Sequence, residues 1–177
     1  HQLGQYAVAM TVAQLSGPFA TAISSVIFPL SAGHQGSESA RIALERRTIW
    51  GTGLVTVAAL AVVAAVGVPL VPIVFGAEFA PAAPLIWLLI PAMLLRALNE
   101  VIAVLLRGRK RPGYAATGQL LSLAIGATMF IVLSPSLGLG AAPLGLGIAE
   151  FVAGGANLFF LRKARTIAAV MSSGEEA

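Results

Sequence analysis

The stretch from residue 85 to residue 106 limits what this chain can fold into more than any other part of the sequence. It is long enough to cross the hydrocarbon core of a bilayer as a helix, which takes roughly 20 apolar residues, and four basic residues between 107 and 111 end it. Arg96, Asn99 and Glu100 interrupt its middle and share one helix face. An ionised group at that depth costs about 2.5–3.5 kcal/mol on insertion scales. We therefore predict a membrane helix whose polar face meets a partner or a water-filled cavity.

The rest of the chain shares this apolar character. Of its 177 residues, 58% are hydrophobic and 10% are charged, whereas soluble domains carry about 25% charged residues. The sequence therefore predicts an all-α fold, a polytopic membrane helix bundle with five transmembrane helices, in a single membrane domain over residues 1–177. The expected spans are 5–28, 48–66, 84–106, 114–133 and 140–161, and a short amphipathic cytoplasmic helix at about 38–47 precedes the second span.

Basic residues alternate along the chain. Ten of the eleven Lys and Arg residues follow the first, third and fifth spans, and the remaining one is Arg96. Loops rich in Lys and Arg stay on the cytoplasmic side of a membrane. We therefore expect a multi-pass protein of the cytoplasmic membrane, with its N-terminus outside and its C-terminus inside. The basic residues of the 38–47 segment and of the RGRKRP loop either contact anionic headgroups or only set this orientation.

Two helix faces carry small or polar residues at regular spacing. In the first span, Thr11, Gln14, Pro18, Thr21 and Ser25 follow steps of three and four residues, which places them on one face. This stripe either hydrogen-bonds to a neighbouring helix or lines a cavity. In the fourth span, small residues recur every four positions, a pattern that lets another helix approach closely. They are Gly118, Ser122 and Gly126.

Several longer stretches resemble one family of membrane transporters. LGQYAVA opens the first span, VIFPLSAG closes it, and VPIVFGAEFAPAAPLIWLLIPAMLL runs through the turn into the third. LLRGRKRP follows the third span, and LGLGAAPLGLGIAEFV opens the fifth. In order and spacing these stretches are similar, over nearly the whole chain, to the C-terminal half of the Wzx-type polysaccharide flippases of the multidrug/oligosaccharidyl-lipid/polysaccharide exporter superfamily.

That resemblance implies two helix bundles facing each other across a central cavity. Such a protein flips a polyprenyl-diphosphate-linked oligosaccharide across the cytoplasmic membrane by alternating access, for surface polysaccharide biosynthesis. The resemblance makes the five spans here the last five of a longer protein, which agrees with a first residue, His1, that is not Met. The implied partners are the lipid-linked oligosaccharide substrate, membrane lipids and the missing N-terminal bundle, and we expect no nucleic acid.

The candidate cavity residues are Arg96, Asn99, Glu100 and Glu150, joined by Thr11, Gln14, Thr21 and Ser25 of the first span. Arg96 is chosen for its depth and polarity, and no substrate-binding residue of the family is carried over to it. Four interpretations of Arg96 remain open. It pairs with Glu100 one turn away, or it bridges to Glu150 in the fifth span. Alternatively, it binds the diphosphate while one carboxyl group serves as the titratable or ion-coupling group, or it faces an interface or the missing half of the protein.

Two other functions remain open alongside the flippase. A drug/cation antiporter of the same superfamily would favour acidic and aromatic residues in the cavity. A membrane-embedded glycan-processing enzyme would favour large polar loops with clustered acids or histidines, which this sequence lacks. The chain has no cysteine, no HExxH motif and no phosphate-binding loop. We therefore expect no enzyme, no catalytic residue, no metal site and no cofactor.

Overall fold

The computed structural model describes residues 2–18, 22 and 38–174 of the chain. Within these residues all regular secondary structure is helical, so the prediction of an all-helical fold is confirmed. Helices suit apolar surroundings because each backbone N–H finds its acceptor within its own segment. The α-helices are α1 (Gln2–Gln14), α3 (Glu38–Val62), α4 (Val68–Val74), α5 (Ala82–Gly108), α6 (Pro112–Leu137) and α7 (Ala141–Gly174).

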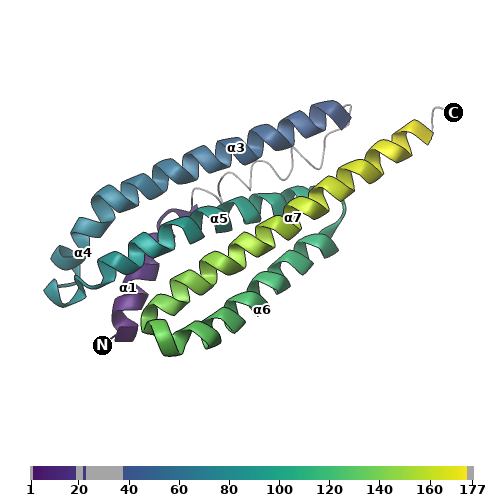
Figure 1. Ribbon diagram of the computed structural model, residues 1–177. Helices are drawn as coiled ribbons and strands as arrows, with labels where there is room; N and C mark the ends of the chain where they lie inside the picture. Colours follow the sequence, from purple (N-terminus) through teal and green to yellow (C-terminus); the bar gives the residue numbers. More distant parts are fainter. Residues whose placement is uncertain (1, 19–21, 23–37, 175–177) are drawn as a thin grey trace.

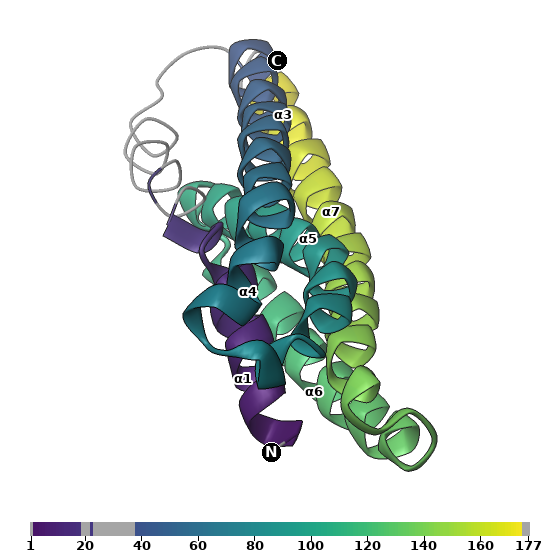
Figure 2. The same ribbon diagram turned by 90° about the vertical axis from the view of Figure 1, so that its left-hand side faces the viewer.

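Helices α3, α5, α6 and α7 lie side by side in an elongated bundle, and α1 lies at the end where α4 is found (Figures 1 and 2). The central helix is α5, which packs against α1, α3, α6 and α7. Helices α6 and α7 run in opposite directions and pack along each other. The other helices are therefore arranged around α5.

Three helical stretches in the described part are long and apolar enough to cross a membrane: Glu38–Val74, Ala82–Gly108 and Pro112–Ile167. The third contains α6 and most of α7, which fold back on each other at Gly138, where a φ of 52° favours glycine. Helix α6 has 26 residues and α7 has 34, so each exceeds the roughly 20 residues that a bilayer requires. The count of five spans is not confirmed, and the first predicted span, 5–28, lies partly outside the described residues.

Some predicted boundaries differ from the structure. The 38–47 segment is not a separate helix but the first part of α3, because no proline or turn sequence separates it from the apolar residues that follow. Helix α6 continues through Pro135 to Leu137, beyond the predicted end, since a proline so near the last turn removes few backbone hydrogen bonds. A π-helical turn, Val63–Gly67, separates α3 from α4, in the region where the sequence predicts an irregular helix end.

Two apolar clusters form the core of the described part. One joins α1, α3, α4 and α5 around Ile86 and Leu89, and the other joins α5, α6 and α7 around Val101 and Leu105. Both draw on α5, one from each half of that helix. The polar residues between positions 96 and 100 therefore lie between two well-packed regions, which hold this part of α5 in place.

The small residues of α6 face α7, as predicted. A Cβ atom on Gly118 would overlap Oδ1 of Asn157, and one on Gly126 would lie 3.6 Å from the nearest α7 atom. Ser122, between them, donates a hydrogen bond to Glu150 of α7 at 3.2 Å. The close approach of these two helices therefore depends on the absence of a side chain at position 118.

Gly118→Ala is expected to lower the thermal stability of the purified protein, while Gly126→Ala leaves it nearly unchanged. The methyl group at 118 overlaps the buried side chain of Asn157, and such overpacking costs about 1–3 kcal/mol. At 126 the added methyl meets α7 at 3.6 Å, an ordinary van der Waals distance. Thermal unfolding in detergent measures both variants. Adding Asn157→Ala to Gly118→Ala should restore most of the loss, and equal losses in the two single variants would contradict this packing.

Candidate functional site

The three polar residues in the middle of α5 face the space between that helix and its neighbours. Arg96 is exposed, Glu100 is partly buried, and Asn99 is buried with 5% of its surface exposed. They are held at one level because α5 is an unbroken helix over this region. Their spacing turns them toward α1 on one side and toward α6 and α7 on the other.

The larger of two hollows on this face lies between α5, α6 and α7 and has a volume of about 680 Å³. Its polar lining consists of Arg96, Asn99, Glu100, Arg107, Gln119, Ser122 and Glu150, and its apolar lining includes Leu123, Phe130 and Leu146. The candidate residues predicted for the third and fifth spans therefore meet in one place. Arg107, Gln119 and Ser122 were not predicted for the site, although the spacing of Gln119 and Ser122 does place them on one face of α6.

A smaller hollow of about 260 Å³ lies between α1 and α5. Gln14 and Ser16 line it on one side, and Arg96 and Glu100 line it on the other. Arg96 and Glu100 thus border both hollows. Of the predicted stripe in the first span, Gln14 is the residue that the structure places beside them.

Glu150 is the best-enclosed charged residue of the larger hollow, with 8% of its surface exposed. Asn99 Nδ2 donates hydrogen bonds to Glu150 Oε2 at 2.7 Å and to the Glu150 backbone oxygen at 2.8 Å. Ser122 Oγ donates to the other carboxylate oxygen at 3.2 Å. This cluster connects α5, α6 and α7 through neutral donors, which satisfy a buried carboxylate without a positive charge.

Neither of the two predicted ion pairs of Arg96 is formed. Within the part of the chain that the structure describes, its guanidinium makes no ion pair or hydrogen bond to Glu100 or Glu150. The side-chain donors that Glu150 does have are Asn99 on Oε2 and Ser122 on Oε1. Arg96 therefore presents a cation to both hollows, and the interpretation of Arg96 as a helix-to-helix bridge finds no support in these contacts.

The remaining predicted residues of the first span are not brought into the hollows. Thr11 is exposed and donates a hydrogen bond to the backbone oxygen of Ala7, one turn earlier in its own helix, at 2.9 Å. It lines neither hollow. Thr21 and Ser25 lie outside the described residues.

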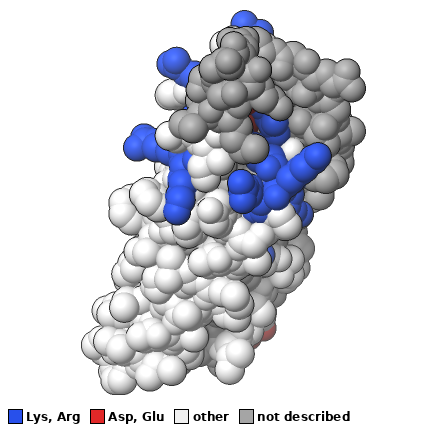
Figure 3. All heavy atoms as spheres, turned by 90° about the vertical axis from the view of Figure 1, so that its right-hand side faces the viewer, with Lys and Arg blue, Asp and Glu red and all other residues white. Residues whose placement is uncertain are grey.

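A second polar cluster joins α3, α7 and the α5–α6 turn at the end of the bundle where basic residues gather (Figure 3). Glu45 of α3 is 2% exposed and accepts from Arg109 Nε at 2.5 Å and from Arg165 Nε at 2.9 Å. Arg109 also pairs with Glu38 at 2.7 Å. Burial alone would lower the pKa of Arg109, but the hydrogen bonds and charges of Glu45 and Glu38 outweigh it and raise that pKa. Sequence reasoning treated these residues as markers of orientation and missed the cluster.

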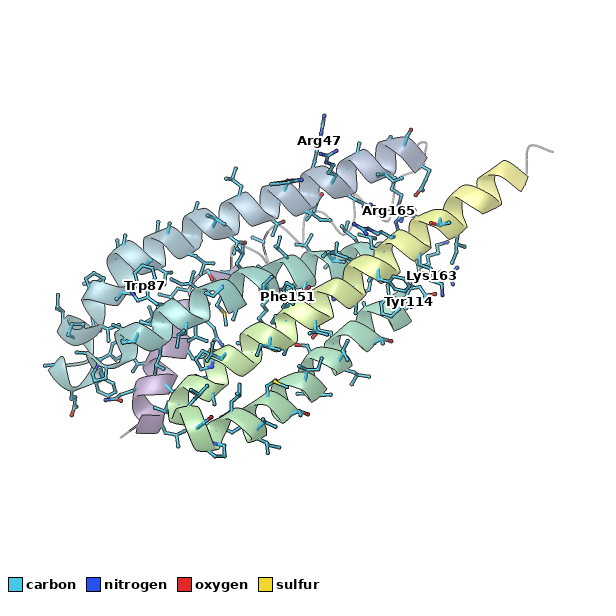
Figure 4. The ribbon with its side chains drawn as sticks, in the orientation of Figure 1. Arg47, Trp87, Tyr114, Phe151, Lys163 and Arg165 are labelled. Carbon is cyan, nitrogen blue, oxygen red and sulfur yellow. The ribbon has the colours of Figure 1, made fainter. Side chains whose placement is uncertain are left out.

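The grouping of basic residues at one end follows from their alternation along the chain. Arg47, Lys163 and Arg165 lie toward the end of the bundle opposite Trp87 (Figure 4). Each of the segments that contain them follows an odd-numbered predicted span, so helices of roughly equal length bring them to the same side.

A cysteine at position 78 is expected to react with a membrane-impermeant thiol reagent in intact cells, and a cysteine at position 110 is not. Both residues are exposed and lie in the connections at the two ends of α5, residue 78 in a short 3-10 helix before it and residue 110 in the turn after it. Arg109 is held in the buried cluster and would report poorly. The expectation follows from the tendency of basic loops to remain cytoplasmic. Labelling before and after cell lysis measures it, and the reverse pattern would refute the predicted orientation.

One family model matches this chain. It is described as "Polysaccharide biosynthesis protein" and covers residues 1–84, which is less than half of the 177 residues. No curated protein and no solved structure matches the chain. Together with the apolar helices, the match supports a membrane protein of polysaccharide biosynthesis. It ends in the first turn of α5, so the site around Arg96 and Glu150 lies beyond it and stands on its geometry.

Proposed function

We propose that this chain forms one side of a transporter that flips a polyprenyl-diphosphate-linked oligosaccharide across the cytoplasmic membrane. The single observation that carries the proposal is the guanidinium of Arg96, which has no ion-pair partner among the described residues and borders both hollows in the middle of an apolar helix. A cation in lipid costs several kcal/mol, whereas one facing a water-filled passage keeps its hydration. The family match to polysaccharide biosynthesis supports the same conclusion at a coarser level.

The chemistry of the larger hollow suits a lipid diphosphate. A guanidinium offers planar, paired donors that fit phosphate oxygens, and Arg107 adds a second one to the same lining. These two cations offset Glu100 and Glu150, which alone would make the hollow net negative. The apolar residues Leu123 and Phe130 of α6 provide a surface for the isoprenoid chain that leaves the diphosphate.

Alternating access requires rigid walls that enclose the passage in turn from each side. Helix α5 meets this requirement, because both of its halves are packed in apolar clusters. The Asn99–Glu150–Ser122 hydrogen bonds tie α5 to α6 and α7 at the level of Arg96. We therefore propose that these three helices move together, and that a second bundle closes the open side of the hollow.

A transport assay tests this function directly. The protein, with its partner bundle, is reconstituted in vesicles that contain a polyprenyl-diphosphate oligosaccharide, and a membrane-impermeant glycosidase is added outside. We expect the cleaved fraction to rise with time above the amount that protein-free vesicles show. If the glycan stays in its leaflet while a lipophilic cation is transported, the antiporter is the correct function. If the glycan is chemically altered before the glycosidase is added, the protein is an enzyme.

A further inference from the structure

A groove between α3 and α7 lies at the basic end of the bundle, apart from the hollows around Arg96. Its volume is about 320 Å³. It combines an apolar floor with a cationic rim. Packing between two helices would not require the cations, and a water-filled passage would not require the apolar floor. The floor includes Ile49, Leu158 and Leu161, and the rim consists of Arg46, Arg162 and Arg165.

The arginines of the rim differ in what they already bind. Arg165 pairs with Glu45 at 2.9 Å. Arg46 and Arg162 are exposed, and neither side chain makes an ion pair or a hydrogen bond with any residue in the described ranges. Two guanidiniums, one from each helix, are therefore free to hold an anion at the mouth of the groove.

The groove continues into a purely apolar track. A second hollow, of about 420 Å³, runs between α3 and α5. Ile49 and Trp50 line both the groove and this hollow. Leu54 and Leu98 are among its lining residues, and it exposes almost no polar atoms. Trp50 is 71% exposed, and tryptophan prefers the interface between headgroups and hydrocarbon. The track therefore leads from the cationic rim toward the apolar part of the bundle.

We propose that this groove binds an anionic phospholipid, with its phosphate between Arg46 and Arg162 and an acyl chain beside Trp50 and Leu54. Basic pockets between membrane helices recognise anionic headgroups, and guanidiniums fit phosphate oxygens in paired contacts. A soluble anion would leave the apolar track unused, and a zwitterionic lipid would bring its own cation to the two arginines. The site binds bulk membrane lipid and is separate from the passage for the transported lipid.

The fluorescence of Trp50 reports whether lipid occupies the groove, because bromine on an acyl chain quenches a tryptophan that it touches. The chain has two tryptophans, and Trp87 lies at the opposite end of the bundle (Figure 4). Trp87→Phe therefore isolates the signal of Trp50. This variant is reconstituted in phosphatidylcholine vesicles that contain a small mole fraction of brominated phosphatidylglycerol or, in parallel, of brominated phosphatidylcholine. We expect the relative affinity for the anionic lipid to be on the order of tenfold higher, and equal quenching by both lipids would overturn the proposal.

Matched pairs of variants separate this groove from general surface charge. The double variant Arg46→Gln, Arg162→Gln should lower the ratio of the affinity for phosphatidylglycerol to the affinity for phosphatidylcholine to about one. Arg111→Gln with Lys163→Gln removes two exposed positive charges at the same end, outside the groove, and should keep the preference. Equal losses in both pairs would overturn the proposal. It would also be wrong if a polyprenyl phosphate, at a far lower mole fraction than the phospholipid, relieved the quenching, since the groove would then belong to the transported lipid.

Discussion

Arg96→Ala is expected to abolish export of the lipid-linked oligosaccharide while the protein reaches the membrane in normal amounts. Because Arg96 has no ion-pair partner in the described part of the chain, its removal leaves no buried acid uncompensated. The loss then falls on substrate binding. Hydrogen bonds to charged groups contribute about 1.5–3 kcal/mol each, so losing a paired contact to a diphosphate should slow transport about 100-fold or more. The vesicle transport rate and the amount of protein in the membrane are measured together.

Two further variants decide what Arg96 does. Arg96→Lys keeps the charge but loses the planar paired donors, so it should recover export only in part. Arg47→Ala removes an exposed arginine of α3 that lines neither hollow around Arg96, and it should leave export unchanged. Full export by a stable Arg96→Ala protein would dismiss the substrate role. If Arg96→Ala instead destabilises the protein and an added Glu100→Ala or Glu150→Ala restores it, the arginine is a structural bridge.

Much of the site was predictable from the sequence because depth and helix face follow from simple periodicities. Arg96 and Glu150 lie near the middle of their apolar segments, and antiparallel or parallel packing of spans of similar length brings such positions to one level. Residues 96, 99 and 100 share a face because of the helical repeat. The structure places all four candidates from these two segments, Asn99 and Glu100 included, in the lining of one hollow.

The partners of these residues were not predictable, because they depend on how each helix is rotated about its axis. One of the open interpretations from the sequence paired Arg96 with Glu150, yet Asn99 and Ser122 hold that carboxylate. Asn99 reaches the carboxylate of Glu150 because its helix approaches α7 closely at a glycine. A Cβ atom on Gly154 would lie 2.9 Å from Asn99 Oδ1, so the glycine makes room for the asparagine beside Glu150. Nothing in a single sequence shows that this glycine faces α5.

The buried role of Glu45 was hidden for a similar reason. In the sequence it belongs to a short charged segment, ESARIALERR, for which we predict an amphipathic cytoplasmic helix at about 38–47. In the structure residues 38–47 are the first part of α3, and α7 likewise extends beyond its apolar part to Gly174. Glu45 of α3 is enclosed between Arg165 of α7 and Arg109 of the α5–α6 turn. The burial of Glu45 therefore depends on three segments that are far apart in sequence.

Glu45→Ala is therefore expected to destabilise the protein more than any other single change in this cluster. It leaves the side chain of Arg109, which is 3% exposed, with Glu38 as its remaining carboxylate partner, and it leaves Arg165 without Glu45. Removing one partner of a buried ion pair costs about 3–5 kcal/mol, because the other charge stays buried. The midpoint of thermal unfolding in detergent and the yield of monodisperse protein measure the effect.

Glu38→Gln is the matched control, because it changes the other carboxylate that binds Arg109. The side chain of Glu38 is 26% exposed, and partly exposed ion pairs contribute about 0–1 kcal/mol, so a small shift is expected. Replacing the buried pair together, Glu45→Leu with Arg109→Leu, should restore much of the stability, since hydrophobic substitutes of similar size are often tolerated in place of a buried pair. A Glu45→Ala protein as stable as the unchanged chain would show that α3 is held by its apolar contacts with α5, and that the charged cluster adds little.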